Sequence, residues 1–392
     1  MARQQVTVAE YYRYLYPYEA LVAWLTMHGH ALERFEFAID GEYYSRFHRI
    51  ATADQLRKTI GTFPGVKSFH IGGIWPEVCD RRSAPTQRIL SIDIDLTDYE
   101  YLEIANKAGN VDMARADWAY PVAVIAIDVL RHLLTVAFGF RQIYVLYSGR
   151  RGVHLHVMDE RAIAMTAEAR GAVAAFMNIS YCKGNHRASS YVRNIAKMYG
   201  LVDRVMHAFT HTLVGTMDLF GDMDQRVQFA QKLELHHDSL RSLPQDVMED
   251  DLTGPAAWEL IQQRVAAAGV AWFKERLLDT VLFYVWPHMD EKVSTDLGHL
   301  IKAPFCAHAK AQRVAVALCP QTYGKWNATL GAPRLDAFDD KAVAAALKHL
   351  SPACEDRMDI EDAVAAAAPP PPPPPPLRKV APKRKKPAAV SN

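Results

Sequence analysis

Asp93 and Asp95 stand two positions apart in segment 88–99, where apolar and polar residues alternate. The apolar positions are Leu90, Ile92, Ile94 and Leu96. This alternation predicts a β-strand, and both carboxylates then leave the same face of it. Carboxylate oxygens are the ligands that Mg²⁺ and Mn²⁺ prefer, so the pair predicts a metal site. An Asp-x-Asp taken alone also matches by chance, and the alternative is an ordinary solvated strand face.

A second segment offers groups that bind phosphate. Residues 142–147 and 153–157 are predicted to form the strands of a hairpin, with Ser-Gly-Arg-Arg-Gly at 148–152 as its turn. Glycines let the backbone approach an anion, and two guanidinium groups match phosphate oxygens in bidentate geometry. In the returning strand we expect His154 to face the acids and His156 to be a satisfied strand histidine. The alternative for the two arginines is a solvated hairpin tip.

A third segment carries Asp290, followed by Lys302 and His308. A compact ammonium and an imidazole N–H can neutralise phosphate charge as it moves to a leaving pyrophosphate. Two metal ions about 3.5–4 Å apart lower the pKa of an attacking hydroxyl and stabilise the leaving group. The three segments therefore predict a nucleotidyl-transfer site. The alternative for Lys302 and His308 is a capped helix followed by a proline-bounded turn.

Hydrophobic periodicity predicts the elements that must position these groups. Segment 120–140 begins with Pro121 and spaces its apolar residues as a buried helix does. Strand, helix and strand hairpin in this order predict an α/β core of mixed helix and sheet. From 161 to about 282 the pattern is mostly helical, which predicts a peripheral helical lobe inserted between the catalytic motifs. We expect one catalytic domain over residues 1–352.

Residues 353–392 have a different composition: an acidic stretch, four alanines, eight prolines and a basic end. Such a segment is predicted to be disordered, with the prolines forming a stiff polyproline II spacer. The basic cluster at 382–387 is interpreted as a nuclear import signal, with a solvated tail that weakly attracts DNA as the alternative. Another hypothesis is that the chain acts mainly as an adaptor through this tail, with the folded part secondary.

The overall composition fits an intracellular enzyme. The chain has 392 residues, half of them hydrophobic, and a net charge of +1, which does not exclude a DNA partner. It has no run of about 18 apolar residues, and its first residues lead into an aromatic-rich segment, so we expect neither a membrane span nor a signal peptide. The five cysteines form no C-x₂-C pair, which argues against a zinc ribbon or a redox dithiol.

Several motifs, in order and spacing, resemble the catalytic small subunit of eukaryotic-type (archaeo-eukaryotic) DNA primases. The motifs are residues 11–18 (YYRYLYPY), 92–99 (IDIDLTDY), 138–140 (FGF), 147–154 (YSGRRGVH) and 299–305 (HLIKAPF), with Asp290 and His308. The resemblance covers about residues 8–310 and implies a primase-like catalytic core. Several long motifs in the right order are far more specific than any one of them.

The resemblance implies roles for individual residues. Asp93, Asp95 and Asp290 would hold two Mg²⁺ or Mn²⁺ ions. The residues implied to contact the nucleotide are Arg46, Ser148, Arg150, Arg151, His154, His299, Lys302 and His308. The implied activity is template-directed synthesis of short RNA primers from NTPs on single-stranded DNA. The implied partners are a large, iron–sulfur-bearing primase subunit and an alpha-type replicative polymerase, in a nucleus or at the replication site of a large DNA virus.

Three positions depart from the family pattern. Where the family has Arg-Glu-Phe-x-Phe, this chain has Glu33 and Arg34 in exchanged places, and Glu33 is the candidate catalytic acid although neighbouring strand residues point to opposite faces. His70 replaces an Asp of animal members near the ribose, which keeps a primase-polymerase that uses dNTPs as an alternative. Segment 101–118 contains no cysteine, so we expect the structural zinc site of the family to be absent.

Two further alternatives follow from these departures. The exchanged Glu33 and the missing cysteines would also suit a primase-like scaffold that has lost activity, although all three metal acids are present. Scattered Cys79, Cys182, His186 and His207 could assemble a zinc site through space, yet their spacing gives no positive signal.

Overall fold

The computed structural model describes residues 5–106, 109–179, 188, 190–233, 240–249 and 251–351. The predicted tail at 353–392 lies outside these residues, as do Cys182 and His186. Within them the chain forms both helices and strands, as expected for a mixed α/β core. Among the described helices, none combines the length and the apolar character needed to cross a bilayer.

Two four-stranded sheets form the centre of the molecule, and all their strand pairs are antiparallel. The first sheet has the order β2 (Tyr44–Ser45), β1 (Phe35–Asp40), β3 (Ser68–Ile74), β7 (Ile301–Lys302). The second has the order β10 (Val316–Ala317), β5 (Ile143–Tyr147), β6 (Gly152–Val157), β4 (Leu90–Asp95). A ladder of β8 (Ala307–His308) and β9 (Arg313–Val314) connects β7 to β10 along the chain.

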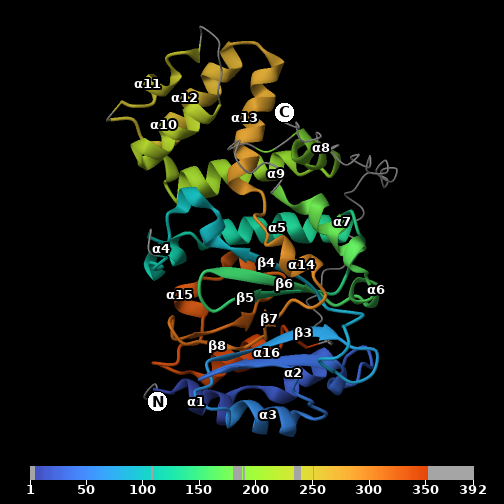
Figure 1. The fold of residues 1–392 in the computed structure, drawn as a ribbon. Coiled ribbons are helices and arrows are strands. Elements are labelled where there is room, and N and C mark those ends of the chain that lie inside the picture. The colour runs from blue at the N-terminus through green and yellow to red at the C-terminus, as the bar shows by residue number, and fades with distance from the viewer. Residues whose placement is uncertain are drawn as a thin grey trace, which may run out of the picture.

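Helices cover the outer faces of this arrangement (Figure 1). At the first sheet lie α1 (Val8–Glu10), a π-helix (Tyr11–Leu15), α2 (Tyr18–Leu25) and α3 (Ala53–Gly61). At the second sheet lie α4 (Met113–Trp118), α5 (Tyr120–Val136), α6 (Glu160–Ile163), α7 (Ala167–Met177) and α14 (Glu291–Thr295). Helices α15 (Ala328–Gly331) and α16 (Asp340–Leu347) complete the described chain.

The helix predicted at 120–140 is α5, which has Pro121 in its first turn and buries ten of its residues. It ends at Val136, because the following segment turns at Gly139 with a positive φ of 65°. The strand predicted at 88–99 is β4, which stops at Asp95, where the carboxylate accepts the amide of Thr97 and the chain enters a 3₁₀ turn. Both elements are confirmed, and local backbone chemistry sets their ends.

The mostly helical region contains helices from α6 to α13, and α8 to α13 stand apart from the two sheets in Figure 1. Its further helices are α8 (Ser190–Met198), α9 (Val202–His207), a π-helix (Ala208–Thr216), α10 (Met223–Lys232), α11 (Leu243–Asp246), α12 (Gly254–Ala267) and α13 (Ala271–Val285). An aromatic cluster fills its interior, in which Phe209, Phe229 and Trp258 contact one another. After α13 the chain returns to the second sheet at Met289, which forms a bridge with Ile94.

Candidate active site

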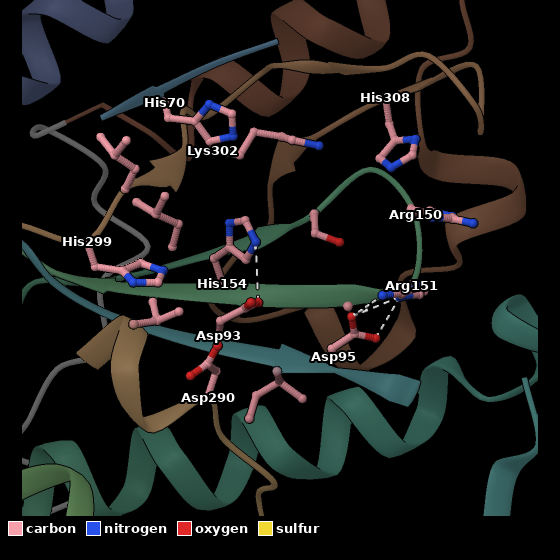
Figure 2. Close-up of a pocket in the computed structure, with 16 residues that line it drawn as sticks. His70, Asp93, Asp95, Arg150, Arg151, His154, Asp290, His299, Lys302 and His308 are labelled. Atoms are coloured by element: carbon pink, nitrogen blue, oxygen red, sulfur yellow. Dashed lines mark hydrogen bonds and ion pairs between the residues drawn. The ribbon is translucent and has the colours of Figure 1, made fainter. Parts of the chain in front are cut away.

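A pocket of about 290 Å³ lies between the two sheets. The first sheet contributes His70 from β3 and Lys302 from β7, and the second contributes Asp93 and Asp95 from β4 and His154 from β6. The remaining charged or polar lining residues are Ser148, Arg150, Arg151, Asp290, His299 and His308. All the predicted nucleotide and metal residues except Glu33 and Arg46 therefore meet in one cavity. Figure 2 shows Asp93 and His154 on one side of this cavity, with Lys302 and His308 across from them.

The three acids form one side of the pocket, called here the acid wall (Asp93, Asp95 and Asp290). Asp93 and Asp95 leave the same face of β4, as the alternation predicted. Asp290 comes from the start of α14, and its backbone amide donates to the carbonyl of Asp93 at 3.2 Å. Its carboxylate caps that helix by accepting the amide of Lys292 at 2.9 Å. Residues almost two hundred positions apart thus become neighbours.

Strand β6 places its histidines opposite the acid strand. Asp93 pairs with His154 and Ser91 pairs with His156 in the β4–β6 ladder. Nε2 of His154 lies 3.4 Å from Oδ1 of Asp93, at the pocket, whereas Nδ1 of His156 bonds the Ser91 hydroxyl at 2.9 Å in the interior. The first residue of β6, Gly152, must be a glycine, because a Cβ there would lie 2.1 Å from the carbonyl oxygen of Ile94. His154 therefore faces the acids as expected, whereas His156 is only half satisfied, because its buried Nε2 has no partner among the described residues.

The opposite side of the pocket is basic and is called here the basic wall (Arg150, Lys302 and His308). Arg150 comes from the turn between β5 and β6, in which Gly149 has a φ of 88° that favours glycine. Lys302 lies in β7 directly opposite His70 of β3. His308 lies in β8, and Figure 2 shows it between Lys302 and Arg150.

The N-terminal tyrosines hold the segment between Lys302 and His308. The hydroxyls of Tyr11 and Tyr16 donate to the carbonyls of Phe305 and Pro304, and the hydroxyl of Tyr12 accepts the amide of Ala307. Phe305 has a φ of 60°, a conformation that persists for a bulky residue only where its surroundings impose it. The tyrosine-rich motif at 11–18 therefore supports the basic wall from behind.

Arg151 is bound to the acid wall through Asp95. Its Nε donates to both carboxylate oxygens of Asp95 at 2.8 Å, and its Nη2 lies 2.7 Å from Oδ2. Thr97 donates its amide and its hydroxyl to the same carboxylate at 2.9 and 2.8 Å. In this conformation Asp95 is therefore neutralised by the protein, and its oxygens are already engaged.

Within the acid wall, the pKa of Asp93 is shifted by its surroundings. Burial, followed by the like charges of Asp95 and Asp290, raises the pKa of Asp93 to about 7. An ionised carboxylate in this position lacks enough nearby positive charge, and a bound cation would supply it.

The histidines around the pocket are shifted in the opposite direction. Burial and the nearby ammonium of Lys302 lower the pKa values of His154 and His308 to about 4 each. The same two causes lower the pKa of His70 to about 4. At neutral pH these rings are uncharged, so they can donate or accept hydrogen bonds while Arg150 and Lys302 carry the positive charge.

The acid wall fits hard divalent cations by the chemistry of its donors. In the part of the chain that the structure describes, no three His, Cys, Asp or Glu side chains already stand in a metal-binding arrangement. In this conformation the oxygens of Asp95 are instead bonded by Arg151 and Thr97. Three carboxylates that line one pocket and repel one another are nonetheless the donor set that Mg²⁺ or Mn²⁺ requires.

Comparison with known proteins agrees with this geometry. The family model described as DNA primase small subunit matches residues 92–319, which is more than half of the chain. This chain belongs to the DNA primase small subunit family. The matched range begins in β4 and includes the hairpin, Asp290, Lys302 and His308. The resemblance carried by the sequence motifs is thereby confirmed.

Curated members of the family match most of this chain. The DNA primase small subunit of Drosophila melanogaster is 28% identical over 388 residues, which cover 90% of this chain and 85% of that protein. The protein of the same name from Schizosaccharomyces pombe is 26% identical over 347 residues, covering 82% and 74%. That from Caenorhabditis elegans is 27% identical over 341 residues, covering 79% and 80%.

Glu33 is not among the residues that line the pocket of this primase subunit. It lies in a 3₁₀ turn before β1, and its carbonyl accepts the amide of Cys79. The structure therefore does not support Glu33 as the acid that reaches the active site. Residues 32–34 form this turn, so strand alternation does not set the direction of Glu33, and the side chain of the neighbouring Arg34 bonds the carbonyl of Trp75.

Glu36 is the acid that sequence reasoning missed. It is completely buried in β1, and its Oε1 accepts Nε of Arg46 at 2.6 Å. Arg46 reaches from β2's end to the carbonyl of Gly298 at 3.4 Å, beside the pocket residue His299. Arg46 thus lies at the rim of the pocket rather than in its lining. The available signal was Glu36 in the middle of an otherwise apolar strand, where an unpaired carboxylate would be costly.

The cysteines add little to this site. Cys79 and Cys306 are buried free thiols, and Cys319 is a partly buried one. Cys182 and Cys354 lie outside the described residues, so the expected absence of the family's zinc site stays a prediction.

Proposed function

We propose that this chain is the catalytic subunit of a primase that joins ribonucleotides on a single-stranded DNA template. Membership of the primase family indicates a nucleotidyltransferase that acts in DNA replication. The observation that carries the finer proposal is one pocket with three carboxylates on one side and three basic side chains on the other. A nucleoside triphosphate presents its reacting phosphate and its anionic tail to just such a pair of surfaces.

Each wall has a separate task in this proposal. Asp93, Asp95 and Asp290 would hold two Mg²⁺ or Mn²⁺ ions, which would lower the pKa of the attacking 3′-hydroxyl and neutralise charge at the reacting phosphate. Arg150 and Lys302 bind and orient the triphosphate tail. Neutral His154 and His308 donate N–H groups to phosphate oxygens.

In the proposed reaction cycle, the guanidinium of Arg151 moves from Asp95 to the triphosphate. This guanidinium occupies Asp95 in this structure. A triphosphate offers a second anion of matching geometry, so nucleotide binding draws Arg151 away and frees the Asp95 oxygens. Ser148 lines the pocket at the same turn and presents its hydroxyl to the phosphates, and His299 lies near Asp93 and Asp290.

The partners and location that we propose follow from the family. A large primase subunit would pair with this chain, and an alpha-type polymerase would extend the RNA primer. The nucleus, or the replication site of a large DNA virus, is the proposed location.

The decisive experiment measures incorporation of labelled ATP on poly(dT) with Mg²⁺ or Mn²⁺. The wild-type chain is compared with Asp93→Ala/Asp95→Ala and with Glu168→Ala, an exposed acid in the first turn of α7. Short products that disappear only in the double variant support the proposal. No product from the wild type, even with a primer and a cognate large subunit, would instead favour a scaffold without activity.

At His70 a second candidate stays open, a primase-polymerase that uses dNTPs. The uncharged ring of His70 lines the pocket, and its Nδ1 is buried without a partner among the described residues. Incorporation of ATP and dATP by one preparation separates the two candidates. Clear preference for dATP would overturn the assignment to RNA primers.

A further inference from the structure

The turn that carries Arg150 is held from behind by a buried hydroxyl. Tyr147 is the last residue of β5, and its ring is fully buried. Its hydroxyl donates to the carbonyl of Arg150 at 3.0 Å and so spans the turn. The same oxygen accepts Nη1 of Arg313 at 3.2 Å. One hydroxyl therefore ties the backbone of the turn to a cation from another strand.

Arg313 is itself fixed by a carboxylate. It is only 4% exposed, and Asp117 of α4 accepts its Nη1 and Nη2 at 2.6 and 2.7 Å. The hydroxyl of Thr329 donates to the second oxygen of Asp117 at 2.6 Å. Besides each other, Arg313 bonds the hydroxyl of Tyr147 and Asp117 accepts the hydroxyl of Thr329, so both members of this partly buried ion pair have further partners. Such networks hold their members rigidly.

The same support reaches the second half of the basic wall. Arg313 stands directly opposite His308 in the β8–β9 ladder. A Cβ on Gly149 would lie 3.3 Å from the amide of Ala315 and 3.5 Å from Cβ of His308, so the turn packs against this segment. Neither Tyr147 nor Arg313 lines the pocket. Both act on the basic wall through its backbone.

We propose that Tyr147 is a positioning residue for the nucleotide, anchored by Arg313 and Asp117. The inference rests on the proposed binding of a triphosphate by this turn. Its hydroxyl keeps the turn in the shape that aims Arg150 into the pocket before any nucleotide arrives. Without the hydroxyl the nucleotide must order the turn as it binds, which weakens binding. The reacting atoms are not touched, so the rate at saturating nucleotide stays the same.

The test compares Tyr147→Phe with Tyr101→Phe in the primer-extension assay. Tyr101 is a matched control, because its buried hydroxyl also donates to one carbonyl, that of Tyr284, at 2.8 Å. We expect Tyr147→Phe to raise KM for ATP about three- to tenfold with kcat unchanged. Tyr101→Phe should leave KM unchanged even where the melting temperature falls as much.

Arg150→Ala separates this inference from the proposed function. If the turn binds the triphosphate, Arg150→Ala raises KM, and Tyr147→Phe adds little more to a chain that already lacks Arg150. A KM that Arg150→Ala leaves unchanged would remove the proposed role of the turn itself. A KM raised by Arg150→Ala and unmoved by Tyr147→Phe would overturn only the positioning role.

A second variant keeps the inference open to refutation should Tyr147→Phe fail to fold. Asp117→Asn retains the shape of the anchor and removes its charge, and it should raise KM in the same direction by a smaller factor. An unchanged KM in a folded Asp117→Asn chain would contradict the anchoring by Arg313.

Discussion

The acid wall and the basic wall of the pocket are stabilised in opposite ways. Elements β4 and α14 bring Asp93 and Asp290 together, and burial, followed by the like charges of Asp95 and Asp290, raises the pKa of Asp93. The basic wall is held by hydrogen bonds from residues behind it, among them Tyr11 and Tyr147. The basic wall thus has supports of its own within the protein, whereas in our proposal bound cations would complete the acid wall.

This difference leads to separate kinetic signatures. Groups that act on the reacting phosphate affect the rate of the chemical step, whereas groups that hold the triphosphate tail affect nucleotide affinity. Variants on the two walls should therefore divide between kcat and KM.

The largest effect is expected for Asp290→Asn. Asparagine still caps α14, so folding is retained, while a metal ligand is lost and kcat should fall about a thousandfold. The control is Asp339→Asn, which changes the N-cap of α16 in the same way, where the carboxylate accepts the amide of Lys341. Primer extension at saturating ATP measures kcat, and retention of a tenth of the rate would show that Asp290 is no metal ligand.

Lys302→Ala should have the next largest effect, on the other wall. Loss of a charged hydrogen bond to phosphate should raise KM for ATP about 10- to 100-fold and change kcat much less. The matched control is Lys310→Ala, an exposed lysine two residues beyond His308. Steady-state kinetics with varied ATP would contradict the division of tasks if kcat fell and KM stayed constant.

Glu36→Gln tests whether Arg46, at the rim of the pocket, affects nucleotide affinity as the residues of the basic wall do. Arg46 loses its charged partner, so KM for ATP should rise about fivefold and the melting temperature should fall by about 3 °C. Glu33→Gln is the control, because Glu33 does not line the pocket. A larger effect from Glu33→Gln would restore Glu33 as the functional acid.

The smallest effect concerns the stability of the acid wall without metal. A carboxyl whose pKa is raised on folding stabilises the fold at low pH, and this stability is lost as pH rises from about 4 to about 7. Asp93→Asn removes that loss, so in EDTA it should raise the melting temperature at pH 8 by about 2 °C and change it little at pH 5. An equal change at both pH values would contradict a raised pKa of Asp93. Excess Mg²⁺ should reverse the gain in melting temperature of the Asp93→Asn chain at pH 8.

Sequence reasoning succeeded where the pattern is local. The alternation around Asp93 predicted the face that it shares with Asp95, and the Gly-Arg-Arg-Gly turn predicted the hairpin. It failed at Glu33 because β1 begins only at Phe35, so the side-chain alternation of a strand does not apply to Glu33. The acid that β1 buries is Glu36, and its place in an otherwise apolar strand was the signal for it.

Neighbouring residues were enough to predict the strand that carries Asp93, the hairpin turn at 148–152 and helix α5, because two-residue and helical periodicities are local. The side chains that stand behind the pocket could be recognised only in the folded protein. Tyr11 meets Phe305 across 294 positions, and Arg313 meets Asp117 across 196. Such contacts depend on how β8, β9 and the N-terminal π-helix pack against the two sheets, and packing leaves no fixed spacing in the chain.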